Sequence, residues 1–264
     1  MIPDLVQPDP ERQHLRLNDD GTTFKVRRQP LIVMPSNATG WLFHSMARET
    51  GRIGHLHSPG AQRGPYPWFP YALDNGAFSC WTPSTNTFDH DKWRVVEKAW
   101  ERLLLWAQVA PVRPRWAIVP DVPGNAAATI ERWSRYAPRV VDAGLTLAVA
   151  VQDGMCIDDV WDLRPEPEVV CVGGTTRWKW ESAWLWCHDF DRVHVLRCNS
   201  PRMLPYLERI GAESTDGTGW NRGDRETTRG LEEWARGSPL EVNTSPLWPY
   251  TCRKERDDQD SLFV

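Results

Sequence analysis

The sequence predicts an α/β protein, a single (β/α)8 TIM-type barrel, from two observations. Short apolar, β-branched segments recur along most of the chain, and helical patterns separate most of them. Continuous apolar strands that alternate with amphipathic helices are typical of a parallel sheet covered by helices. A chain of 264 residues has the usual size of one such domain. Eight candidate strands in one domain then favour a closed barrel over an open sheet.

The candidate strands fall into two groups. The longer ones are apolar runs at 31–35, 116–120, 146–151, 168–172 and 193–196. The shorter ones lie at 71–73, 212–215 and 240–243. Together they supply the number of strands that the barrel needs.

Two amphipathic helices stand out between these strands. One apolar stripe with three- and four-residue spacing runs over 93–107, and another runs over 130–140. Pro138 lies inside the second stripe, where its missing N–H and its ring are expected to kink or shorten the helix.

The barrel is expected to occupy residues 30–250. Residues 1–29 are polar and proline-bearing, so we expect an irregular N-terminal arm. Residues 251–264 form a charged C-terminal tail that is expected to fray or to pack only at its end.

Composition excludes several classes of protein. The net charge of −4 argues against a generally basic nucleic-acid-binding surface, although a local basic face remains open. No apolar run approaches the roughly 18 residues that a membrane span requires, and the first residues have no signal-peptide pattern. The six cysteines are scattered singly without zinc-ligand spacing. We therefore expect a cytoplasmic protein with no metal site.

Polar residues and glycines follow almost every predicted strand at once. These strand-end residues are Asp74, Asn75, Gly76, Asp121, Gln152, Gly173, Gly174, Arg197 and Asp216. In a parallel barrel all such positions share the C-terminal rim, where the loops converge on one pocket. A single Asp-Gly or Asn-Gly pair is ordinary turn chemistry. Several of them on one rim favour a functional site.

The residue types suit chemistry at a glycosidic bond to a nucleobase. Carboxylates can act as nucleophile and as acid or base at an anomeric carbon. A carboxylate can also accept from amino and ring N–H groups, whereas an amide and backbone N–H groups can donate to a carbonyl oxygen.

Four stretches resemble the tRNA-guanine transglycosylases in their order and rough spacing. They are "LDNGAF", "AVAVQDG", "CVGGTT" and "GAESTDGTGW", within residues 31–225. The closer resemblance is to the shorter DNA-modifying enzymes of phages and bacteria, which exchange guanine in DNA for a 7-deazaguanine such as 7-cyano-7-deazaguanine. The tRNA enzymes also carry a zinc subdomain with three closely spaced cysteines and a distant histidine. Only Cys252 lies near this C-terminus, so that subdomain is expected to be missing, which favours DNA over tRNA.

The resemblance implies two catalytic carboxylates. Asp216 would attack C1′ of the target deoxyguanosine, expel guanine and form a covalent ester. Asp74 would be the general base that removes the N9 proton of the incoming deazaguanine. Two displacements at one carbon account for the need for both groups and for retention of configuration.

The resemblance also implies the base-binding residues. Asp121 would pair with the amino and ring N–H edge of the purine. Gln152 and the backbone N–H of Gly173 or Gly174 would hold the carbonyl oxygen. Phe78 is a candidate pocket wall, with core packing as the alternative.

Cations and tryptophans near the rim are candidates for binding nucleic acid, because the target base must be flipped out or single-stranded. The phosphate-binding candidates are Arg177, Lys179, Arg197, Arg222 and Arg225. Trp178, Trp180 and Trp220 could stack on bases or sugars. An ordinary solvated charge is the alternative for each cation. Arg197 stands where the family pattern leads us to expect glycine, so its side chain could alter the pocket or bind a phosphate.

Other interpretations stay open at this point. A tRNA-type transglycosylase or a glycoside hydrolase could use the same carboxylates, and an inactive barrel could serve as a nucleic-acid-binding or protein-binding subunit. The histidines at 55, 57 and 194 share no ligand spacing with a carboxylate, and His194 is expected to be a hydrogen-bonded core residue. The resemblance implies no cofactor, and a location in the host cytoplasm if the gene is a phage gene. The expected partners are DNA and the free base, and a protein partner or a homo-oligomer is left open.

Overall fold

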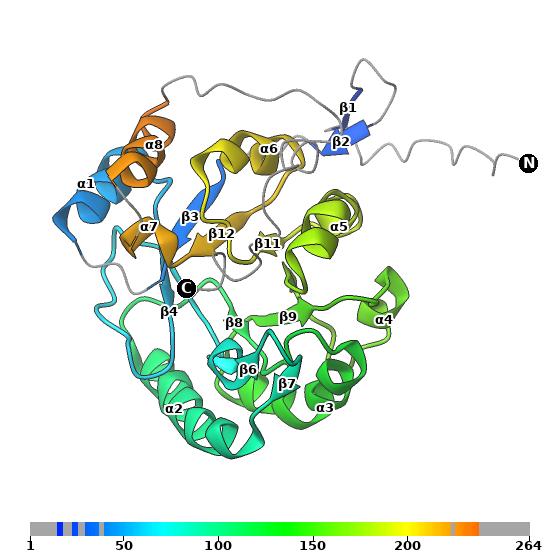
Figure 1. Ribbon diagram of the computed structural model, residues 1–264. Helices are drawn as coiled ribbons and strands as arrows, with labels where there is room; N and C mark the ends of the chain where they lie inside the picture. The colour runs from blue at the N-terminus through cyan, green and yellow to red at the C-terminus, as the bar shows by residue number, and fades with distance from the viewer. Residues whose placement is uncertain (1–14, 18–22, 26–29, 37–39, 223–224, 238–264) are drawn as a thin grey trace, which may run out of the picture.

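Eight parallel strands form a barrel at the centre of the molecule, with helices around it (Figure 1). The computed structural model describes residues 15–17, 23–25, 30–36, 40–222 and 225–237. The strands are β3 (Ile32–Pro35), β4 (His55–His57), β5 (Tyr71–Leu73), β8 (Ala117–Ile118), β9 (Leu147–Val151), β10 (Val169–Val172), β11 (Val193–Val195) and β12 (Ser214–Gly217). They are paired in the order β3-β12-β11-β10-β9-β8-β5-β4. Parallel bridges between Val33 and Ile53 and between Ser36 and Leu56 bring the two outer strands together. The predicted (β/α)8 barrel is confirmed.

Seven predicted strands are present, and the eighth is a different segment. It is β4, with the sequence His-Leu-His, whereas the predicted strand at 240–243 lies outside the described residues. Leu56 points into the barrel, and the alternation of a strand turns His55 and His57 outward. Both histidines are buried against aromatic rings, including those of Phe69 and Tyr71. A strand with two polar residues on its buried outer face has no apolar run by which to recognise it.

Helices of unequal length cover the barrel (Figure 1). They are α1 (Trp41–Thr50), α2 (His90–Val109), α3 (Ala126–Asp142), α4 (Ile157–Trp161), α5 (Thr176–Asp189), α6 (Leu204–Arg209), α7 (Gly219–Arg222) and α8 (Arg225–Ala235). Asp89 caps α2 by accepting from the N–H groups of Asp91 and Lys92. The α3 helix continues through Pro138 to Asp142, so the expected shortening is wrong.

Short 3-10 turns and two-stranded hairpins lie in the barrel loops and in the N-terminal arm. The β5–α2 connection contains the 3-10 turn η2 (Ala77–Cys80) and a hairpin of β6 (Trp81–Thr82) and β7 (Thr87–Phe88). A second 3-10 turn, η3 (Pro201–Met203), leads into α6. The N-terminal arm is not wholly irregular, because β1 (Leu15–Leu17) and β2 (Thr23–Lys25) pair antiparallel within it. The predicted tail at 251–264 lies outside the described residues.

Two hydrophobic cores hold the fold together. A large outer core fills the space between the strands and the helices, and a smaller inner core fills the barrel. The inner core includes Ile32, Met34, Trp116, Ile118, Ala150 and Cys171. It closes the barrel below the rim, so a ligand can enter only from the loop end.

An ion cluster lies at the N-terminal ends of the strands, opposite the rim. The buried carboxylate of Glu213 receives Arg115 at 2.7 Å and Arg192 at 2.8 Å. Burial raises the pKa of Glu213, but the hydrogen bonds and charges of the two arginines outweigh it and bring that pKa down to about 2. The cluster ties together the residues that precede β8, β11 and β12.

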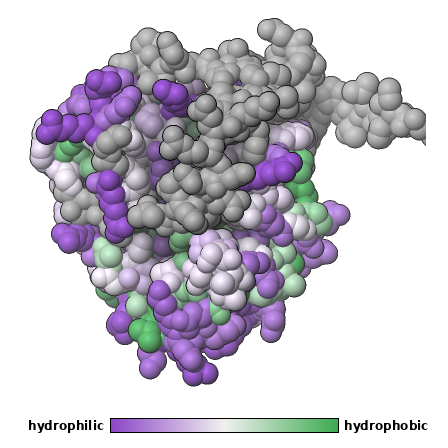
Figure 2. Space-filling model, in the orientation of Figure 1, coloured by the Kyte–Doolittle hydropathy of each residue, from purple (hydrophilic) through white to green (hydrophobic). Residues whose placement is uncertain are grey.

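On the face seen in Figure 2, hydrophilic side chains surround small separate apolar patches. Within the described ranges, no helix combines the length and the apolar character needed to cross a membrane.

Candidate active site

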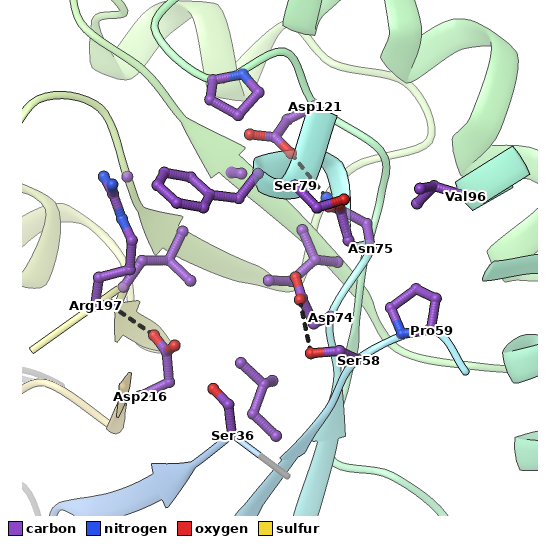
Figure 3. Close-up of a pocket in the computed structure, with 18 of the residues that line it drawn as sticks. Ser36, Ser58, Pro59, Asp74, Asn75, Ser79, Val96, Asp121, Arg197 and Asp216 are labelled. Carbon is purple, nitrogen blue, oxygen red and sulfur yellow. Dashed lines mark hydrogen bonds between the residues drawn. The ribbon is translucent and has the colours of Figure 1, made fainter. Parts of the chain in front are cut away.

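A cavity of about 440 Å³ opens at the C-terminal ends of the strands (Figure 3). It brings together residues from the C-terminal ends of all eight strands, including Ser36 after β3 and Ser58 after β4. The predicted site residues that line it are Asp74, Phe78, Asp121, Gln152, Gly173, Gly174, Arg197 and Asp216. The two carboxylates with predicted catalytic roles therefore lie in the same cavity although 142 residues separate them in the chain, from 74 to 216.

Asp216 projects from β12 into the cavity, with one carboxylate oxygen tied to the protein. Oδ1 accepts from the backbone N–H of Arg197 at 2.7 Å and lies 3.2 Å from His194 Nε2. Among the described residues, Oδ2 has no hydrogen-bond partner. The carboxylate is therefore fixed through one oxygen, and the other is left for a substrate.

Asp74 reaches the same cavity from the end of β5 (Figure 3). Ser58 Oγ donates to its Oδ2 at 3.2 Å. Burial and the negative charge of Asp216 raise the pKa of Asp74 to about 6, against the opposing hydrogen bonds from Gly76 and Ser58. A carboxyl group with such a pKa can both give and take a proton near neutral pH.

A third carboxylate, Asp121, is held between two side-chain amides. Asn75 Nδ2 donates to Oδ1 at 2.8 Å, and Gln152 Nε2 donates to Oδ2 at 2.7 Å. Burial raises the pKa of Asp121, and the hydrogen bond from Asn75 acts in the opposite direction. The two amides fix the plane of this carboxylate at the cavity wall.

The predicted carbonyl-binding groups are largely occupied by the protein itself. Gln152 Oε1 accepts from the backbone N–H groups of Gly124 and Gly174, at 3.0 and 3.1 Å. The N–H of Gly173 donates to the carbonyl of Val151 at 3.0 Å. The predicted use of the two glycine N–H groups for a purine carbonyl therefore needs correction, because in this structure they bind protein oxygens. Gln152 instead connects the loops after β8 and β10 to Asp121.

Arg197 occupies an unusual backbone position at the cavity. Its φ is 58°, in the left-handed region that favours glycine, which agrees with the glycine expected there. Its guanidinium lies 4.7 Å from the ring centre of Phe78 and donates to the carbonyl of Gly174. Arg197 thus forms part of the cavity wall together with Phe78.

Two predicted nucleic-acid contacts are wrong because their side chains are buried. Lys179 is only 2% exposed, and its Nζ donates to the carbonyls of Leu196 and Arg197 at 2.7 and 3.1 Å. Burial and the nearby charge of Arg197 lower the pKa of Lys179 to about 7. Trp220 is fully buried, so it cannot stack on a base. Lys179 instead holds the segment that follows β11 through these two carbonyls.

The remaining candidates lie where a polynucleotide could reach them. Arg177 lies in the first turn of α5, Arg222 ends α7 and Arg225 begins α8, and all three are exposed. Arg177 also forms an ion pair with Glu181. Trp178 and Trp180 are half-buried against the outer core. The proposed phosphate and stacking contacts of these residues stay predictions.

Two side chains, Ser58 and His194, were missed as functional candidates, and Asn75 was placed on the rim without a role of its own. Asn75 lies in the quoted "LDNGAF" stretch, where turn chemistry explained it equally well. His194 was predicted to be a hydrogen-bonded core residue, and it is fully buried with a partner at each ring nitrogen. Its contact with Asp216 follows from the parallel register of β11 and β12, which the sequence alone does not give.

Comparison with known proteins assigns no function to this site. The chain matches no family model and no curated protein sequence. Within the described part of the chain, no three histidines, cysteines or carboxylates are grouped so that they could hold a metal ion. The arrangement of two facing carboxylates and a third, amide-bound one can support nucleophilic displacement with proton transfer.

Proposed function

We propose that this protein is a DNA guanine transglycosylase, a pentosyltransferase that exchanges guanine for a 7-deazaguanine such as 7-cyano-7-deazaguanine. The observation that carries the proposal is that Asp74 and Asp216 line one cavity, with Asp121 on its wall. The choice of guanine and of DNA rests on the resemblance of the four strand-end motifs to the transglycosylases.

In the first displacement, Asp216 Oδ2 attacks C1′ of the target nucleotide. The C1′–N9 bond breaks, its electron pair goes to N9, and the protonated carboxyl group of Asp74 can supply a proton to the departing guanine. The hydrogen bonds of Arg197 N–H and His194 to Asp216 Oδ1 keep the attacking oxygen, Oδ2, directed at the cavity. The product is a glycosyl ester of Asp216.

In the second displacement, the ionised Asp74 takes the N9 proton of the incoming deazaguanine. N9 attacks C1′, the ester bond breaks, and its electron pair returns to the carboxylate of Asp216. The negative charge of Asp216 is one cause of the raised pKa of Asp74. Ester formation removes that charge. Asp74 is therefore a stronger acid in the adduct and remains ionised for its role as base.

Asp121 is the group that suits the amino and ring N–H edge of the purine. Its two oxygens already receive Asn75 and Gln152, and each carboxylate oxygen can accept more than one hydrogen bond. Phe78 supplies an aromatic wall at the same cavity. The target nucleotide must leave the base stack to reach these groups.

Incorporation of a labelled base tests the proposal. The protein would be incubated with labelled guanine or 7-cyano-7-deazaguanine and with duplex DNA, single-stranded DNA or tRNA. Label in DNA that depends on Asp216 supports the proposal. Label only in tRNA would make this a tRNA-type enzyme, and binding without any exchange would make it an inactive binding subunit.

A further inference from the structure

His194 lies inside the barrel directly beneath Asp216. It is fully buried on β11, and its ring lies 4.7 Å from that of Trp116 in the inner core. Its Nδ1 is 2.8 Å from Ser214 Oγ, and its Nε2 is 3.2 Å from Asp216 Oδ1. Ser214 and Asp216 are two residues apart on β12, so both side chains face this histidine.

The direction of these hydrogen bonds follows from the chemistry of the groups. An ionised carboxylate can only accept, so Nε2 must carry the proton that it donates to Asp216. In the neutral ring Nδ1 is then an acceptor, and the hydroxyl of Ser214 donates to it. The carboxylate of Asp216 thus sets the histidine tautomer, and Ser214 matches it by donating to Nδ1.

We propose that His194 is a positioning residue that stabilises the carboxylate of Asp216 as a leaving group, an inference that rests on the proposed function. A donor to Oδ1 stabilises the charged carboxylate more than the neutral ester. His194 therefore shifts the balance between ester and released carboxylate toward release. His194 thereby keeps the covalent ester from accumulating as a stable end product.

The equilibrium between adduct and free guanine measures this effect. A guanine-containing oligonucleotide is mixed with protein and increasing free guanine, and the denaturation-resistant adduct is quantified after quenching. His194→Phe removes the donor, and we expect the guanine concentration that halves the adduct to rise roughly 10- to 100-fold, the value of one charge-assisted hydrogen bond. His194→Gln places an amide donor near the same point and should return the midpoint toward that of the unaltered protein.

Ser214→Ala provides a second variant that keeps the histidine. Loss of the hydroxyl leaves Nδ1 without its donor and the ring less firmly held, so the midpoint should rise by less than in His194→Phe. Equal midpoints in the unaltered protein, Ser214→Ala and any folded His194→Phe protein would overturn the inference and leave the proposed function standing. The absence of any adduct in the unaltered protein would instead overturn the proposed function.

Discussion

The side-chain amide of Gln152 donates to Asp121 Oδ2 over 2.7 Å while its own oxygen accepts from Gly174. Both amides that contact Asp121 donate to it, and an ionised carboxylate can only accept hydrogen bonds. Asp121 lines the cavity as an acceptor for N–H groups, and in the proposed function it is the group that distinguishes purines by their hydrogen-bonding edge.

Asp121→Asn should therefore weaken binding of the free base. Asparagine has one accepting oxygen in place of two, so an N–H group of the base would be left without an acceptor. An unmatched buried donor costs about 1–3 kcal/mol, so KM for the base should rise roughly 5- to 150-fold. Steady-state exchange checks this, with Asp91→Asn on exposed α2 as the matched control. An unchanged KM would remove Asp121 from base recognition.

The two displacements should depend on pH in opposite ways. Adduct formation uses protonated Asp74, so its rate should fall as the pH rises above about 6. Capture of the incoming base uses ionised Asp74, so its rate should rise with pH. The pH midpoint of the capture step should lie below the pH midpoint of adduct formation, because the ester has removed the charge of Asp216. Rapid-quench measurements of each half-reaction check both slopes.

Ser58→Ala refines the same test. The Ser58 hydroxyl stabilises ionised Asp74, so its loss should raise the pKa of Asp74 and move both pH profiles to higher pH. Ser45→Ala, on α1, is the control. If Ser58→Ala left both profiles in place, the acid and base in this reaction would not be Asp74.

Substitution of Arg197 separates backbone strain from side-chain function. At a φ of 58°, alanine keeps the strain and loses the contacts with Phe78 and Gly174, whereas glycine relieves the strain. We expect Arg197→Gly to be about 1 kcal/mol more stable than Arg197→Ala. Both variants should alter KM for the base alike, because both lose the same side chain. Denaturant unfolding and exchange kinetics measure the two effects, and equal stability would argue against strain at this residue.

Glu213→Gln should destabilise the fold by about 3 kcal/mol, because it leaves two arginines facing a neutral group in a buried cluster. The pKa of Glu213 is lower in the folded protein than its ordinary value of 4.5. Its charged form thus adds stability above pH 4.5, and this is lost as the pH falls toward about 2. Urea unfolding across this range should show a weaker pH dependence in Glu213→Gln, whereas Glu233→Gln on α8 should match the unaltered protein.

The rim of the site could be predicted from the sequence because strand ends are marked by local pattern. Five apolar runs and two shorter candidates located seven strands, and the residues directly after them had to share one end of a parallel barrel. Asp74, Asp121 and Asp216 were found in this way. The strand β4 was missed because its two histidines lie outward among aromatic rings and break the apolar run.

Contacts between distant segments could not be predicted in the same way. The oxygen of Gln152 is occupied by Gly124 from another loop, and His194 meets Asp216 through strand register. The burial of Lys179 could not be predicted from the sequence, because α5 carries tryptophans on several sides. The apolar pattern of α5 therefore does not show which face of the helix is covered. Such features depend on tertiary packing rather than on local spacing.

A covalent adduct on one identified aspartate tests the central claim most directly. Protein would be incubated with a guanine-containing oligonucleotide, denatured, digested and analysed by mass spectrometry. The account predicts a nucleotide ester on Asp216 that Asp216→Asn abolishes and that Asp74→Asn still forms, but more slowly because it lacks the acid for the departing guanine. An ester on a different residue, or full base exchange by Asp216→Asn, would contradict it.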